Sequence, residues 1–198
     1  MVSAQHVADY VIWSSHESGS FISNLKLQKL LFYVQAWHLA VFRRPLFPEK
    51  FQAWVRGPAI PEIYQRYQGY QWRNIDEDVR PPDLDPKTVA FMEEVLEEYG
   101  PLDARRLEQL ARREDPWIKA RGGIADDEPS TATIDEETMG VCYRQRLSET
   151  ELRDMLRELE ETGSGGEAGV VQALNFDPTT GEALPSVIGE ARTGRTAG

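Results

Sequence analysis

Two stretches of the sequence, residues 24–38 and 53–64, combine the residue types that dominate protein-binding surfaces. Tyr, Trp and Arg side chains cover a large area at a modest entropy cost, and both stretches mix such side chains with Lys or Gln. The alternative is that aromatics such as Trp37 and Trp54 belong to the core and that Gly57-Pro58 is only a turn. Together with one later aromatic, the candidate partner-binding residues are Lys26, Gln28, Lys29, Tyr33, Trp37, Trp54, Arg56, Gly57, Pro58, Pro61, Tyr64 and Trp117.

The patterns that would indicate catalysis or metal binding do not occur. The histidines His6, His16 and His38 do not share a helical spacing, and a single histidine on an apolar helix is more typical of a hydrogen-bonded core residue. Cys142 is the one cysteine, and its position on an apolar helix face indicates an unreactive thiol. Phosphate-binding glycine loops and nucleophile elbows are also missing. We therefore predict a protein that is not an enzyme and holds no cofactor or metal, although an enzyme without a recognisable site stays an alternative.

The overall composition indicates a folded protein of the cytosol. The chain has 198 residues, of which 40% are hydrophobic and five are Trp, enough for a core. We expect no membrane span, because no apolar run of about 18 residues occurs, and the first residues do not resemble a signal peptide. A single cysteine excludes an intramolecular disulfide and fits a reducing compartment.

The formal net charge of −11 is unevenly distributed along the chain. Residues 21–73 carry eight basic and two acidic groups, whereas 74–99 carry two basic and nine acidic groups. The acidic total makes nucleic acid an unlikely partner. The basic stretch is either a solvated face opposite the acidic segments or a patch that meets an acidic protein partner.

The elements that would position these residues are mainly helices. Residues 24–42, which Ser23 can cap, are apolar on nearly all sides. This pattern predicts a central buried helix whose polar residues either find buried partners or form an exposed strip. Further helices are expected at residues 3–15 and 61–68, and another from Pro86 to Gly100. A helix that begins at Asp103 is expected to end at Pro116. Two more are expected, one with a capping box at Thr133 and Glu136 and one that begins at Ser148. A short strand is expected at 51–56, followed by a turn at Gly57-Pro58, and a loop at 69–85.

These elements predict a mainly α (α+β) fold, in which a compact helical domain surrounds the central helix and includes a short strand element. The domain is expected to span residues 1–161. From Thr162 the composition changes to Gly and Ser, which predicts a flexible linker and tail over 162–198.

Several separated blocks of the sequence resemble a known family in order and spacing. They are Asn24-Leu25-Lys26-Leu27-Gln28-Lys29-Leu30-Leu31-Phe32-Tyr33, Ala36-Trp37-His38, Pro45-Leu46-Phe47, Ala53-Trp54-Val55-Arg56-Gly57-Pro58, Pro61-Glu62-Ile63-Tyr64 and Asp115-Pro116-Trp117. Over about residues 5–147 the chain resembles the Panacea domain, a SocA-like antitoxin family that is also seen as phage-associated proteins. The chain departs from it at Ala111-Arg112, where many members have Thr-His, so no role of that histidine carries over.

The resemblance implies a mainly helical antitoxin that blocks a cognate protein toxin, which we expect the adjacent gene to encode. It also implies a cytosolic binding module without cofactors. A DNA-binding autoregulator, which the basic stretch favours, and an adaptor that delivers a bound protein to a protease stay as alternatives. The oligomeric state is left open.

Overall fold

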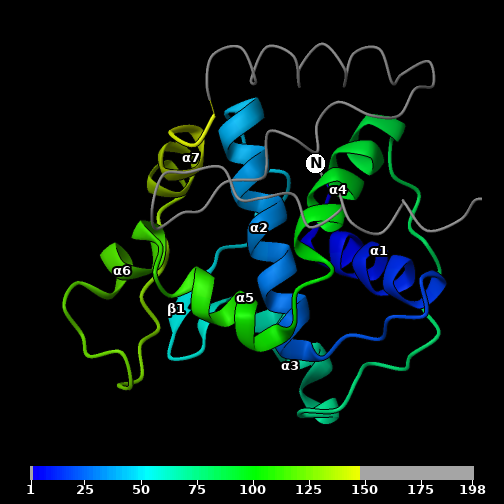
Figure 1. Cartoon of the computed structure of the whole chain (residues 1–198), viewed down its shortest axis with the longest axis horizontal. Helices are drawn as coiled ribbons and strands as arrows, with labels where there is room; N and C mark the ends of the chain where they lie inside the picture. The colour runs from blue at the N-terminus through cyan, green and yellow to red at the C-terminus, as the bar shows by residue number, and fades with distance from the viewer. Residues whose placement is uncertain (1, 148–198) are drawn as a thin grey trace, which may run out of the picture.

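The helix α2 (Asn24–Phe42) runs through the middle of the molecule (Figure 1). The structure is a computed structural model, and it describes residues 2–147. The helix predicted from Ser148 and the linker and tail predicted at 162–198 lie outside the described residues. Ser23 caps α2 by accepting a hydrogen bond from the Lys26 N–H, as predicted.

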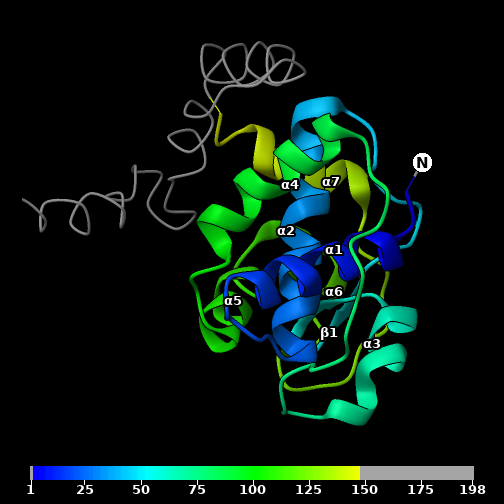
Figure 2. The same ribbon diagram turned by 90° about the vertical axis from the view of Figure 1, so that its right-hand side faces the viewer.

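Five helices pack against α2, which confirms that it is the central buried helix. Sixteen of its 19 residues are buried. The neighbours are α1 (Ala4–Glu17), α3 (Pro61–Tyr67), α4 (Pro86–Tyr99), α5 (Ala104–Ala111) and α7 (Glu136–Arg144). When the molecule is turned by 90°, α1 lies in front of α2, with α6 and α7 behind it (Figure 2). Because α2 is enclosed, each polar group that it carries needs a partner within the protein.

A two-stranded antiparallel hairpin lies beside α2 and consists of β1 (Gln52–Trp54) and β2 (Gly57–Ala59). In this register Ala53 faces Pro58. The Ala53 N–H donates to the Ala132 carbonyl at 2.8 Å, on the side away from β2. The Ala53 and Pro58 pair is therefore of the non-hydrogen-bonded kind, which accommodates a proline and directs both carbonyl groups outward.

The hairpin corrects two predictions. The expected strand at 51–56 is shorter, and Gly57-Pro58 is not a turn but the beginning of the second strand. The turn lies at Val55-Arg56 instead. Gly57 has φ of +87°, a conformation that side chains disfavour, and this allows the chain to enter β2 directly after the turn.

The predicted helix at 61–68 is confirmed as α3 (Pro61–Tyr67), which continues into the short 3₁₀-helix η1 (Gln68–Tyr70). Pro116 does not close a helix, because it lies in the first turn of α6 (Asp115–Arg121), a helix that we did not predict. Proline is favoured there since its missing N–H has no partner in a first turn.

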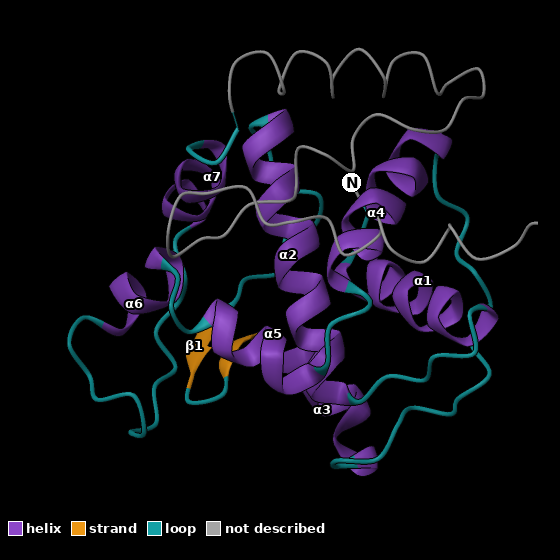
Figure 3. Ribbon diagram, viewed as in Figure 1, coloured by secondary structure: helices purple, strands orange, loops and turns teal. Residues whose placement is uncertain are grey.

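The cap of α7 also differs from the prediction. Asp135, rather than Thr133, accepts the hydrogen bond from the Thr138 N–H, at 2.7 Å. Within residues 2–147 the fold is thus mainly helical with one small sheet, as predicted (Figure 3). None of the helices in this part of the chain is long and apolar enough to cross a membrane.

Candidate functional site

A cavity of about 950 Å³ lies between the first turns of α2, the hairpin, α3 with η1, the start of α5 and the loop at 129–131. The cavity brings together half of the residues that the sequence singled out. Those that line it are Gln28, Lys29, Trp54, Arg56, Gly57 and Tyr64.

Three of the predicted partner-binding aromatics lie in the core instead. Tyr33, Trp37 and Trp117 are at most 1% exposed. The Tyr33 ring stacks on Tyr99 at 3.9 Å between ring centroids, and the Trp37 indole N–H donates to the Tyr99 hydroxyl group. These three side chains cannot form part of a surface without rearrangement of the core, so the alternative reading holds for Trp37 and not for Trp54.

The remaining candidates lie at the edge of the cavity or away from it. Pro58 is buried within β2, and Pro61 is half-buried at the start of α3. Lys26 lies on another flank of α2, where its ammonium group donates to the Gly100 carbonyl at 2.6 Å. Lys26 therefore does not share a surface with Lys29, although both were assigned to one polar strip.

The polar residues of α2 that face the cavity are buried and paired rather than exposed. Gln28 is 2% exposed, and its side-chain carbonyl accepts from the Ile60 N–H at 2.8 Å. Its amide group donates to Asn24 at 3.2 Å, and the Asn24 amide group donates to the Tyr64 carbonyl at 3.0 Å. This chain of amide groups fixes α3, and with it Tyr64, relative to α2.

Lys29 is the one cationic group of α2 that is fully buried, at 1% exposure. Its ammonium group donates to the Pro58 carbonyl at 2.6 Å, and so supplies the partner that the outward-facing carbonyl needs. Burial lowers the pKa of Lys29 to about 7, and the charges of Arg56 and Arg112 lower it too, against the opposing effect of Glu108. At neutral pH the Lys29 side chain is therefore close to the midpoint between its charged and its neutral form.

Three aromatic rings line the cavity. Trp54 and Tyr64 pack edge to face with 5.0 Å between ring centroids. Trp72 lines the same cavity and is 84% exposed, the most exposed of the large hydrophobic side chains. The sequence did not single out Trp72, because it lies in a stretch with only loop signals, so exposure was the missing information.

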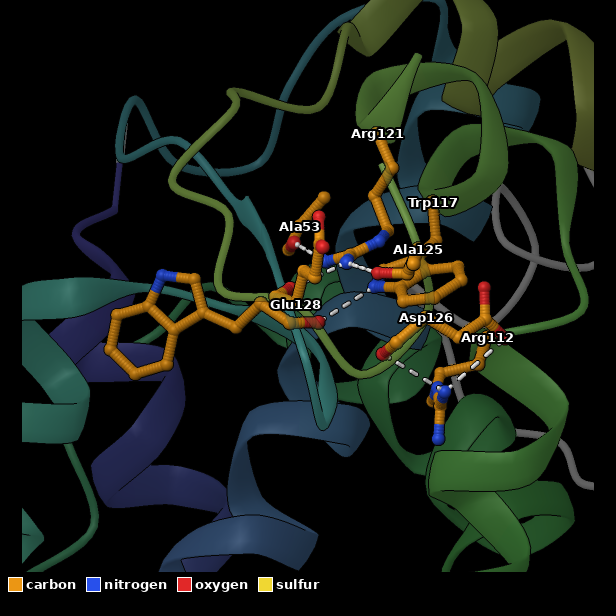
Figure 4. Close-up of polar contacts among 8 residues, drawn as sticks. Ala53, Arg112, Trp117, Arg121, Ala125, Asp126 and Glu128 are labelled. Carbon is orange, nitrogen blue, oxygen red and sulfur yellow. Dashed lines mark hydrogen bonds and ion pairs between the residues drawn. The ribbon is translucent and has the colours of Figure 1, made fainter. Parts of the chain in front are cut away.

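Arg121 fixes the far side of the hairpin (Figure 4). It is 2% exposed, and its guanidinium group donates to the Ala53 carbonyl at 2.9 Å and to the Glu128 carbonyl at 2.6 Å. It also donates to the Ala125 carbonyl. Arg121 therefore ties β1 to the loop that leads to the cavity wall at 129–131. The sequence analysis missed it, because a basic residue in the last turn of a helix usually faces solvent.

Trp117 reinforces this side of the hairpin. Its indole N–H donates to the Trp54 carbonyl at 2.9 Å, and the Arg121 guanidinium group lies 4.7 Å from its ring centroid. The Arg112 guanidinium group lies 5.2 Å from the same ring and forms an ion pair with Asp126 at 3.3 Å (Figure 4). Trp117 is thus a positioning residue for Trp54 and not a surface residue.

The charged residues that line the cavity are all cations, Lys29, Arg56 and Arg105. Arg56 forms an ion pair with Glu108 at 2.8 Å, just outside the lining. Among residues 2–147 no group of His, Cys, Asp and Glu side chains is arranged to hold a metal ion. The cavity therefore offers positive charge and aromatic surface, the features of a binding site for an anionic group with an apolar neighbour.

Comparison with known proteins agrees with the resemblance seen in the sequence. Neither the curated proteins nor the solved structures contain a match to the chain. A family model does match, and the matched segment runs from α2 through the hairpin into α6. The model is described as the antitoxin SocA-like Panacea domain, and it matches residues 27–118.

Proposed function

We propose that this protein is the antitoxin of a bacterial or phage toxin–antitoxin pair, and that it neutralises a cognate protein toxin in the cytosol by binding it directly. The match of residues 27–118 to the SocA-like antitoxin family carries this proposal. The cavity supports it, because exposed aromatic and arginine side chains meet there, as they do at the energetic centres of protein interfaces.

The proposed toxin-binding surface is the mouth of the cavity. It includes Trp54, Arg56 and Tyr64 from the original candidates, and Trp72 and Arg105 in addition. Arg56 is suited to contact a partner because it lies in the hairpin turn with 66% of its side chain exposed.

Co-expression with the adjacent reading frame tests the proposal. The neighbouring protein should arrest growth when expressed alone, and co-expression of this chain should restore growth and yield a complex that co-purifies. A neighbour that is harmless alone, or that does not co-purify, contradicts the proposal.

The substitution Arg56→Glu tests the surface. It should weaken the complex by about tenfold or more, while the melting temperature stays near that of the wild type, because the Arg56 side chain is 66% exposed and an ion pair of an exposed arginine adds little stability. Arg66→Glu is the matched control, since Arg66 is also an exposed arginine paired with a glutamate, Glu77, but does not line the cavity. Equal weakening by both variants would remove the cavity from the interface.

Two other functions lead to different results in simple assays. A DNA-binding autoregulator would shift its own promoter in a gel with a steep dependence on salt. A protease adaptor would need a tether, so deletion of residues 163–198 would abolish delivery, whereas direct neutralisation would survive that deletion.

A further inference from the structure

Charge complementarity indicates what the cavity binds. Among residues 2–147 its lining has three cationic side chains and no carboxylate, in a chain whose formal net charge is −11. Glu108 forms an ion pair with Arg56, and its charge also acts on Lys29, but neither Lys29 nor Arg105 forms an ion pair with a carboxylate among residues 2–147. A concave, cationic site in an acidic protein selects an anionic group.

Lys29 is the buried cation of this site. An ammonium group has three N–H donors, and within residues 2–147 the Lys29 ammonium has one hydrogen-bond acceptor, the Pro58 carbonyl. A cation buried without a counter-ion is unusual, because desolvation is costly unless the charge is paired. Gly57 keeps the space over this group open, since a side chain there would place its Cβ atom 3.1 Å from both Cε and Nζ of Lys29.

The aromatic rings limit the kind of anion. Trp54 and Tyr64 form an apolar wall beside the cations, and Trp72 extends it outward at 84% exposure. At about 950 Å³ the cavity is larger than a free carboxylate or phosphate needs and has room for a few side chains. The combination fits an acidic side chain that has a large apolar neighbour in the same chain segment.

We propose that the cavity anchors a partner protein by an Asp or Glu side chain placed beside Lys29, with an adjacent apolar side chain of the partner packed on Trp54, Tyr64 and Trp72. This inference rests on the proposed function for the identity of the partner as a protein, and it deepens that function by naming the chemistry of the anchor. A nucleic-acid phosphate would be attracted by the same cations, but the acidic total charge of the chain disfavours it.

The test uses the full chain labelled with ¹⁵N and two blocked peptides, acetyl-Phe-Glu-Leu-amide and its Gln counterpart. The indole N–H signals of Trp54 and Trp72 should shift with the Glu peptide, while those of the distant Trp13 and Trp37 stay in place. Assignment follows from Trp54→Phe and Trp72→Phe. The Glu peptide should bind about tenfold more tightly than the Gln peptide, because only the former pairs with the buried cation.

Two lysines of α2 give a matched pair of variants. Lys29 and Lys26 both donate to a backbone carbonyl at 2.6 Å, but only Lys29 lines the cavity. Lys29→Met should abolish the preference for the Glu peptide, and Lys26→Met should leave it unchanged. If Lys29→Met does not fold, the exposed Arg105→Gln serves instead, with a partial loss of the preference.

The pH dependence provides a further readout. The groups that face Lys29 are Glu108 from α5, Arg56 from the hairpin turn and Arg112 beyond α5, and the pKa of Lys29 is about 7. Binding of the Glu peptide should weaken by about tenfold between pH 6 and pH 8, as the free ammonium loses its proton. Equal binding of the Glu and Gln peptides by the wild type, or binding of a single-stranded oligonucleotide in preference to the Glu peptide, would overturn the inference. Neither result depends on a toxin, so a failure here is distinguishable from a failure of neutralisation in the co-expression assay.

Discussion

The two outward carbonyl groups of the hairpin, those of Ala53 and Pro58, are bound by two buried cations in contrasting ways. On the α6 side, Arg121 donates to Ala53 and to two further carbonyl groups of the loop that follows α6. On the α2 side, Lys29 donates to Pro58 and faces the cavity. On one side of the hairpin the guanidinium group joins three carbonyl groups, whereas on the other the ammonium group binds one carbonyl group and has further N–H donors.

This difference indicates that the α6 side holds the hairpin in place, whereas the α2 side has N–H donors for the proposed binding. A guanidinium group has five donors in a fixed plane, and it suits a site where several carbonyl groups converge. An ammonium group is a compact charge whose pKa shifts readily on burial, and it can respond to an incoming anion. We expect removal of Arg121 to damage the fold and removal of Lys29 to alter binding and pH dependence.

The largest effect is expected for Arg121→Met. It leaves the buried Ala53 carbonyl and two carbonyl groups of the loop after α6 without their donor, and it should lower the free energy of unfolding by about 3 kcal/mol. Urea denaturation measures this loss. Arg113→Met, at an exposed arginine nearby, should change stability by less than about 0.5 kcal/mol. A mild effect of Arg121→Met would mean that water replaces the guanidinium group, and the contrast between the two sides would break.

The next effect concerns Lys29 and pH. Its folded pKa is about 7 and its unfolded pKa is near the ordinary 10.5, so above pH 7 the unfolded chain binds more protons than the folded one. This contribution makes stability rise with pH in that window. Between pH 7 and pH 9 the wild type should therefore gain about 2 kcal/mol relative to Lys29→Met. A constant difference across this range would show that Lys29 stays charged in the folded protein.

A smaller effect is expected for Gly57→Ala. The residue has φ of +87°, and a Cβ atom there would crowd the Lys29 ammonium group at 3.1 Å. We expect a loss of about 1.5 kcal/mol from backbone strain, together with weaker binding of the acidic peptide as the space over Lys29 closes. Gly69→Ala is the control, because nothing lies within 4 Å of its added Cβ atom. Equal losses in both variants would argue against a special role of the space beside Lys29.

The smallest effect is expected for Glu108→Ala. Glu108 forms an ion pair with Arg56, whose side chain is 66% exposed. Removal of the Glu108 carboxylate should therefore lower the free energy of unfolding by less than about 1 kcal/mol, as measured by thermal unfolding. A loss of several kcal/mol would mean that the cavity mouth is part of the fold, which would contradict our separation of the two sides.

Much of the fold could be predicted from periodicity and caps. The helix 24–42 and its Ser23 cap are confirmed, since an all-round apolar pattern and an N-cap are local signals. The hairpin was predicted only in part, because the pairing of Ala53 with Pro58 depends on contacts with Ala132, far along the chain. The helix α6 was missed, because Pro116 is equally compatible with the end of one helix and the start of the next.

Six of the twelve candidate residues lie together at the cavity. Trp54, Arg56 and Tyr64 were selected by residue type, and they line the cavity. Tyr33 and Trp37 were selected for the same reason, but they are buried in the core, which residue type alone does not reveal. The buried state of Lys29 also has no local signal. It follows from tertiary packing of the hairpin on α2, which the periodicity of a single helix does not encode.

The position of Arg121 has a consequence for how the protein can be divided. The matched family segment ends at residue 118, inside α6, and begins at residue 27, after the Ser23 cap. A chain cut to that segment would lack the guanidinium clamp on β1, the α7 helix that covers α2 and the first helix of the protein. The stretch matched by the family model is therefore shorter than the set of elements that pack on α2, and domain grafting should carry α1 and α7 with it.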